Sequence, residues 1–236
     1  MLKINDATNF RRTGAGLCLI GGPFAALIGG LLAAWEGTAQ TEAWLRVLAD
    51  HPARGQASAV FLYLGYLLIA VGIFGLMNLL RHRSVVLGHV AGALAILGWV
   101  TLPGLLVTDF YDLSLAQTLG PERGAAVAER AQGYVGAAAM GIPVPLGVLG
   151  LVLLLVALWR AGFAPAWVPV LYFIGTAVSF FGPPTLVAFT SGTVAWLATL
   201  GYVGLRVLRM TDGEWELGTQ PAADTSVIVG ARPQVR

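Results

Sequence analysis

Residues 13–35 decide the fold of this chain, and they read TGAGLCLIGGPFAALIGGLLAAW. The stretch contains no Asp, Glu, Lys or Arg, and a helix needs about 20 apolar residues to cross the hydrocarbon core of a bilayer. Five more charge-free apolar stretches follow it. Together the six cover residues 13–35, 57–80, 85–108, 134–159, 164–182 and 184–205. The sequence therefore predicts an all-α, polytopic membrane helix bundle with six transmembrane helices.

The composition agrees with a membrane location. Hydrophobic residues make up 57% of the 236 residues and charged residues only 11%, against about 25% in a typical soluble domain. The mean hydropathy is +0.76. The lipid bilayer is thus the expected partner, and a net charge of +2 is too small to indicate nucleic-acid binding.

Basic residues are divided unevenly between the two sides of the predicted membrane. With the N-terminus in the cytoplasm, the inner side holds Lys3, Arg11, Arg12, Arg81, Arg83, Arg160, Arg206 and Arg209, and the outer side holds Arg46, Arg54, Arg123 and Arg130. Basic residues in short loops favour the cytoplasmic side. We therefore expect a multi-pass protein of the cell membrane with both termini cytoplasmic.

Two segments outside the apolar stretches carry further expectations. Residues 41–51, in the first outer loop, predict a short amphipathic helix with Thr41 as N-cap, lying on the outer membrane surface. Residues 211–236 are polar and show no period, which is typical of a flexible cytoplasmic tail. The expected organisation is a transmembrane domain over residues 1–210 followed by this tail.

Small residues recur at every fourth position of the first stretch. They are Gly14, Cys18, Gly22, Ala26, Gly30 and Ala34. Such a row lets another helix approach closely, which drives helix association in lipid. It fits either a homodimer face or packing within the chain, and in a chain of six helices we favour packing within the chain, with the first helix central.

The outward half of the predicted bundle is rich in proline, hydroxyl and aromatic residues. Membrane-helix prolines kink helices and splay a bundle, which indicates an uncharged pocket that opens outward and holds a lipid or a small apolar ligand. The candidate ligand-binding residues are Tyr63, Tyr66, Trp99, Thr101, Tyr134 and Thr190. In the alternative interpretation, the prolines mark helix ends and the hydroxyls bond back to their own helices.

Carboxylates gather at the outer rim. Asp109 and Asp112 share a helix face if the third helix continues, and Glu36, Asp50 and His51 come from the other long outer loop. Asp109, Asp112 and Glu36 are candidate catalytic acids, and His51, Asp109 and Asp112 are a candidate metal cluster. Their spacing matches no specific motif, so we predict neither a metal site nor a cofactor, and helix capping by solvated charges is the alternative.

Three features resemble those of uncharacterised bacterial six-helix integral membrane proteins of the domain-of-unknown-function class. They are the glycine-rich span from Gly14 to Ala34, the amphipathic segment 41–56, and the link Leu79-Leu80-Arg81-His82-Arg83. The resemblance covers most of the membrane region. It implies a fold and carries over no catalytic residue.

Three functions stay open at this point. The first is a non-enzymatic membrane protein with an outward-facing neutral pocket, or a protein that supports a membrane partner or a second copy of itself. The second is a membrane-embedded enzyme acting on a lipid or isoprenoid with acids at the outer rim. The third is a transporter of a neutral solute, since ion coupling requires carboxylates or unwound carbonyls at the midplane.

Overall fold

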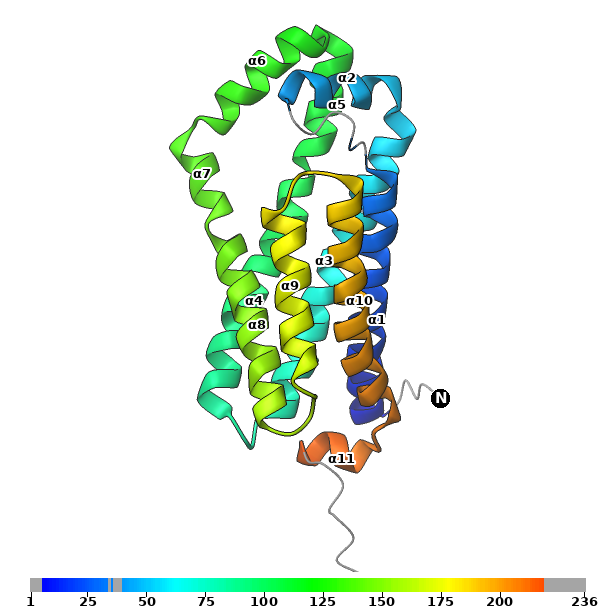
Figure 1. The fold of residues 1–236 in the computed structure, drawn as a ribbon, viewed down its shortest axis with the longest axis vertical. Helices are drawn as coiled ribbons and strands as arrows, with labels where there is room; N and C mark the ends of the chain where they lie inside the picture. The colour runs from blue at the N-terminus through cyan, green and yellow to red at the C-terminus, as the bar shows by residue number, and fades with distance from the viewer. Residues whose placement is uncertain (1–5, 34, 36–39, 219–236) are drawn as a thin grey trace, which may run out of the picture.

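A computed structural model describes residues 6–33, 35 and 40–218, and all regular structure in these residues is helical. The helices form an elongated bundle with a group of short helices across one end and one short helix across the other (Figure 1). The helices are α1 (Ala7–Leu32), α2 (Thr41–Asp50), α3 (Pro52–Leu80), α4 (Val85–Leu106), α5 (Thr108–Leu119), α6 (Pro121–Gln132), α7 (Val135–Gly141), α8 (Pro143–Arg160), α9 (Trp167–Phe181), α10 (Leu186–Arg209) and α11 (Asp212–Leu217).

Five of the six predicted spans coincide with helical segments long and apolar enough to cross a membrane. These segments are Ala7–Leu32, Pro52–Leu80, Val85–Leu119, Val135–Arg160 and Leu186–Arg209. The sixth predicted span corresponds to α9, which is apolar but has only 15 residues. At 1.5 Å per residue α9 is about 22 Å long, less than the roughly 30 Å of a hydrocarbon core.

Helix α1 packs most extensively against α3 and α10. Gly65 of α3 lies so close to α1 that a Cβ there would be 2.7 Å from the backbone nitrogen of Ala26. Part of the small-residue row of α1, including Gly22 and Ala26, is therefore used within the chain. Gly14 is different, because a Cβ at that position would meet nothing within 4 Å.

Aromatic side chains fill the centre of the bundle. Trp99 of α4 lies between Tyr66 of α3 and Trp196 of α10, with ring centroids 5.6 Å and 5.4 Å away and nearly perpendicular planes. The Trp196 indole donates a hydrogen bond of 2.9 Å to the Thr176 hydroxyl of α9. Edge-to-face packing of this kind gives a solid interior.

Helices α2, α5 and α6 form a small cap with its own apolar core of Leu45, Leu48, Leu113, Ala116 and Ala125. The predicted amphipathic helix thus exists as α2, but protein covers its apolar face where a lipid surface was expected. Its N-cap is Gln40, one residue before the predicted Thr41. The turn from α5 to α6 runs through Gly120, whose φ of +78° favours glycine, into Pro121 at the first turn of α6.

The predicted fourth span consists of two helices. The proline ring of Pro143 cannot continue the hydrogen bonding of the preceding turn, and α7 ends at Gly141 just before it. Most α7 residues are exposed, and α7 packs mainly against its chain neighbours α6 and α8. Helix α8 runs beside α4 down to the far end of the bundle.

The start of the predicted flexible tail is ordered as α11. The Thr211 hydroxyl accepts a hydrogen bond from the Glu214 backbone N–H, and the Glu214 carboxylate accepts one from the Thr211 backbone N–H. This reciprocal capping box satisfies two free backbone donors and starts the helix. Trp215 of α11 is only 4% exposed against the bundle. The expected tail is therefore docked up to Leu217, and residues 219–236 lie outside the described part of the chain.

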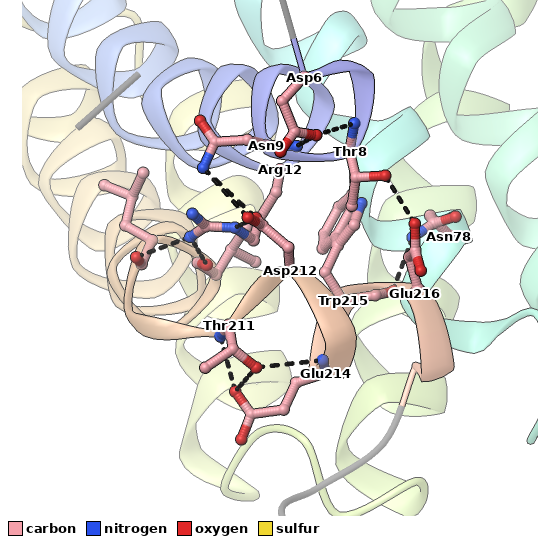
Figure 2. A network of polar contacts seen from close by, with 12 residues as sticks. Asp6, Thr8, Asn9, Arg12, Asn78, Thr211, Asp212, Glu214, Trp215 and Glu216 are labelled. Atoms are coloured by element: carbon pink, nitrogen blue, oxygen red, sulfur yellow. Dashed lines mark hydrogen bonds and ion pairs between the residues drawn. The ribbon is translucent and has the colours of Figure 1, made fainter. Parts of the chain in front are cut away.

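Arg12 fixes α11 to α1 and to the end of α10. Its Nε donates to Asp212 Oδ1 at 2.8 Å, and its Nη1 donates to the carbonyls of Val207 and Leu208 at 3.3 and 2.9 Å. Figure 2 shows this ion pair beside the side chain of Asn9, which also points at Asp212. The buried guanidinium thus gives the Leu208 carbonyl at the end of α10 a donor, and it adds a second donor to the Val207 carbonyl, which also accepts from the Met210 backbone N–H.

Candidate functional site

A polar hollow lies between α2, α5 and α6, and we call it the cap cavity. Its volume is about 790 Å³, within the range of small-molecule sites. Its lining consists of Gln40, Thr41, Glu42, Trp44, Thr108, Asp109, Asp112, Glu129 and Gln132. Helix α2, from the first predicted outer loop, therefore contributes to one site with α5 and α6, which come from the second.

The cap cavity lies past the end of α4. Helix α4 has 22 residues, which gives about 33 Å and matches the thickness of a hydrocarbon core. Helix α5 follows it after the single residue Val107 and carries Asp109 in its first turn. Asp109 and Asp112 thus follow directly on a long helix, whereas Glu42 and Glu129 come from α2 and α6.

Asp109 and Asp112 lie one turn apart on α5 and both face the cap cavity. Burial, and to a smaller extent the nearby Asp112 carboxylate, raise the pKa of Asp109 to about 7. Burial also raises the pKa of Asp112, while a hydrogen bond with Trp44 opposes that rise. The surroundings of Asp109 therefore favour the neutral form of its carboxyl group.

Two further carboxylates come from the other cap helices. Glu42 of α2 forms an exposed ion pair with Arg46, one turn along the same helix, at 2.6 Å. Glu129 of α6 lines the open side of the cavity. Four carboxylates therefore surround a cavity whose lining contains no arginine or lysine, and the Trp44 indole offers an aromatic surface among them.

The candidate metal cluster is not assembled by the described residues. No group of three or more His, Cys, Asp or Glu side chains in the described chain is arranged to hold a metal ion. His51 is exposed at the α2–α3 junction and does not line the cavity that contains Asp109 and Asp112. The candidate acid Glu36 lies outside the described residues.

The six candidate ligand-binding residues lie in different environments. Tyr66 and Trp99 are 5% and 1% exposed and belong to the aromatic core, whereas Tyr63 and Tyr134 are exposed on the bundle surface. Thr101 is half-buried and donates to the Leu97 carbonyl of its own helix at 2.7 Å. Thr190 Oγ1 is buried without a hydrogen-bond partner among the described residues.

These placements favour the alternative interpretation of the outward half for several groups. The hydroxyls of Thr101 and Ser191 bond back to carbonyls of their own helices, and the Thr108 hydroxyl donates to the Leu105 carbonyl at the end of the preceding helix α4. His89 likewise contacts the Val85 carbonyl of its own helix, with 2.7 Å between Nδ1 and the oxygen. Membrane helices are apolar on every face, so periodicity alone could not separate core aromatics from pocket-lining ones.

Asp109 and Asp112 were predicted from the sequence as site residues, whereas the cavity residues Glu42, Trp44 and Glu129 were not. Glu42 and Trp44 lie in the segment that was predicted only as an amphipathic surface helix. Glu129 had no local signal, because only the Gly120–Pro121 turn brings α6 back beside α2. That Gly-Pro turn between two helical segments was the one sequence feature that pointed to the fold-back.

We compared the chain with models of protein families, with curated proteins and with solved structures, and none of the three comparisons found a match. The function is therefore inferred from the sites themselves.

Proposed function

We propose that this chain is a six-crossing protein of the cell membrane that binds a small organic cation in the cap cavity, on the outer side, with both termini in the cytoplasm. The observation that carries the proposal is the cavity of about 790 Å³ in which the charged lining residues, among those that the structure describes, are the four carboxylates Glu42, Asp109, Asp112 and Glu129. A cavity of this charge attracts cations and repels anions.

The proposed topology rests on the arrangement of the helices. Helix α9 runs beside α10 and α8, so we infer that it crosses the same slab despite its 15 residues. Six crossings leave both ends of the chain on one side, which agrees with α1 starting at the same end of the bundle as α11 (Figure 1). Among the described residues that end carries seven arginines and the capped end four, so the positive-inside rule makes the capped end the outer one.

The shape of the site favours an organic cation over a metal ion. The carboxylates line the cavity on three helices and form no group of three that could hold a metal in the described chain. Trp44 lines the same cavity, and an indole face attracts an ammonium group, an interaction that strengthens to about 2 kcal/mol when the pair is desolvated. A ligand with a positive, partly apolar head matches both features.

Calorimetric titration of the purified full-length protein in nanodiscs tests this proposal. The probe is choline, and its uncharged carbon isostere 3,3-dimethylbutan-1-ol is the control ligand. We expect choline to bind and the isostere to bind at least about tenfold more weakly, since an ammonium group contributes roughly 1–2 kcal/mol with its carboxylate and aromatic partners. Equal affinity for the two probes, or no choline binding up to high millimolar concentration, would falsify the proposal.

Substitutions in the cavity test the location of the site. Asp112→Asn and Glu129→Gln each remove one charge from the lining, and we expect either to weaken choline binding. The matched control is Glu122→Gln on α6, which removes the same charge from an exposed residue outside the lining. An equal loss from the control variant would show that general surface charge, and not the cavity, attracts the cation.

A second candidate function is supported by the raised pKa of Asp109. A carboxyl group that is protonated near neutral pH inside a cavity is suited to general acid catalysis, and a membrane-embedded enzyme acting on a neutral lipid or isoprenoid would use Asp109 as the acid. Incubation with squalene followed by mass spectrometry tests this alternative. The enzymatic alternative predicts a product that forms with the native chain and does not form with the variant Asp109→Asn.

A further inference from the structure

A second hollow lies at the opposite end of the bundle, along the seam between α1 and α3, and we call it the seam groove. Its volume is about 510 Å³. It extends from Arg11 and Arg81 at the end of the bundle to Cys18 on α1 and Val71 on α3. At 1.5 Å per residue this is about 10 Å along α1 and 15 Å along α3.

The walls of the seam groove are apolar and face outward from the bundle. Phe10 of α1 and Phe74 and Val71 of α3 are exposed large hydrophobic residues that line it. Between them Gly14 leaves the groove open, because a Cβ at Gly14 would have nothing within 4 Å. An exposed apolar channel on a membrane-spanning surface fits an acyl chain.

The mouth of the seam groove is positively charged. Arg11 and Arg81 line it from the two sides, and neither forms an ion pair with a carboxylate in the described part of the chain. Arg81 donates to Asn78 Oδ1 at 3.0 Å and to His82 Nε2 at 3.0 Å, which positions its guanidinium. Arginine donates pairs of hydrogen bonds to phosphate oxygens.

Helix α11 closes the lower wall of the groove and brings one opposing charge. Trp215 and Glu216 both line the groove, and in Figure 2 the Glu216 side chain points to Thr8, whose hydroxyl donates to it at 2.7 Å. Asn78 donates to the Trp215 backbone carbonyl at 3.3 Å. The mouth therefore carries two arginines against one hydrogen-bonded carboxylate, a net positive charge.

We propose that the seam groove binds a phospholipid with an anionic headgroup, with one acyl chain beside Gly14 and Phe74 and the phosphate between Arg11 and Arg81. Charge complementarity selects this occupant, because basic pockets between membrane helices on the cytoplasmic side attract anionic headgroups. The site is separate from the cap cavity, so it stands independently of cation binding there.

Native mass spectrometry of the full-length protein released from detergent tests the proposal. The probes are phosphatidylglycerol and phosphatidylcholine with identical acyl chains, added in equal amounts. We expect phosphatidylglycerol adducts to dominate. In the double variant Arg11→Gln/Arg81→Gln, the preference for phosphatidylglycerol should fall by about fivefold for each arginine removed. Glu216→Gln keeps the hydrogen bond to Thr8 and should increase the preference.

Matched controls separate the groove from general surface charge and from folding. Arg160→Gln/Arg209→Gln removes the same charge from exposed residues at the same end of the bundle, outside the groove, and should keep the preference. Gly14→Leu places a side chain in the groove, at a position where a Cβ meets nothing within 4 Å, and should reduce adducts of both lipids. Gly104→Leu on α4, where a Cβ also meets nothing within 4 Å, should leave them unchanged.

Three results would overturn the proposal. The first is equal binding of the two lipids by the native chain. The second is that free glycerol phosphate, at the same concentration as phosphatidylglycerol, competes with this lipid for binding. This result would identify a phosphate site without an acyl-chain groove. The third is that the native chain forms a dimer that binds no phosphatidylglycerol and that Gly14→Leu dissociates. This result would show that a second copy of the chain covers the groove.

Discussion

The capped end and the α11 end of the bundle are both closed by short helices, yet their hollows differ in charge and in lining. At the capped end, α2, α5 and α6 pack on one another and surround a polar cavity lined by carboxylates. At the α11 end, one short helix docks on α1 and leaves an apolar groove with arginines at its mouth. The cap is a small folding unit with its own core, whereas α11 depends on the bundle for its order.

The largest effect is expected from Trp215→Ala. Removing a buried tryptophan costs about 3–5 kcal/mol, and α11 has only six residues and no core of its own. We expect α11 to detach while the cap stays folded. Limited proteolysis and amide hydrogen exchange across residues 210–218 measure this, with the exposed Leu217→Ala on the same helix as control. Native-like protection in Trp215→Ala would mean that the Arg12 network alone docks α11.

The next effect is expected from Leu45→Ala, which removes a fully buried side chain from the cap core. Truncation of a buried leucine costs about 2–5 kcal/mol. Because the cap has a separate core, hydrogen exchange should accelerate in α2, α5 and α6 and not in α1 or α3, and choline binding should be lost. The exposed Val127→Ala on α6 is the control. Equal acceleration throughout the bundle would contradict the separation of cap and bundle.

A smaller effect concerns pH. The pKa of Asp109 is raised to about 7, so the group is neutral below that value and negative above it. Choline affinity should therefore increase by about fivefold between pH 6 and pH 8, the gain from one added charge close to the ligand. The stability of the cap should change in the opposite direction. A carboxyl whose folded pKa is raised stabilises the fold fully below its unfolded pKa near 4, and the contribution is lost as the pH rises through 7.

Asp109→Asn is the variant that tests both signs. It should remove the pH dependence of choline affinity and of cap stability together, as measured by titration calorimetry and by hydrogen exchange in α5. A pH dependence that persists in Asp109→Asn would assign it to another carboxylate of the cavity.

The smallest effect is expected from Arg46→Gln. The Arg46–Glu42 pair is exposed and spans one helical turn, so its loss should cost at most about 0.5 kcal/mol of stability. The free Glu42 carboxylate should then improve choline binding by no more than about twofold. Weaker binding in this variant would show that Arg46 positions Glu42 for the ligand.

The sequence was sufficient to predict the helical class and most of the long apolar helices, because a long charge-free stretch has few alternatives to a membrane helix. Its amphipathic pattern also predicted a helix over residues 41–51, where the structure has α2 at Thr41–Asp50. The partner of that apolar face could not be derived, since Leu45 and Leu48 would show the same pattern against lipid or against protein. Only the tertiary fold shows that α5 and α6 cover it.

Other differences between the sequence-based predictions and the structure have identifiable causes. Tyr66 and Trp99 were expected to line a pocket and instead pack in the aromatic core, because the helices that carry them are apolar all round. The start of α11 was missed although Thr211 and Glu214 form a visible capping-box pattern. The seam groove was not foreseen, because α1 and α3 define it together and the row from Gly14 to Ala34 gave no sign of which positions stay uncovered.

The shortness of α9 has a consequence for the surrounding bilayer. Its 15 residues lie beside the 24 residues of α10. Its outer face carries exposed Val170, Phe173 and Ile174, which lipid covers in the proposed six-crossing topology. A hydrophobic length of about 22 Å shortens the acyl layer next to it by several ångströms, at a cost of a fraction of a kcal/mol per ångström. We therefore expect the membrane to be locally thinned along this one side of the protein, and the protein to favour bilayers with shorter acyl chains.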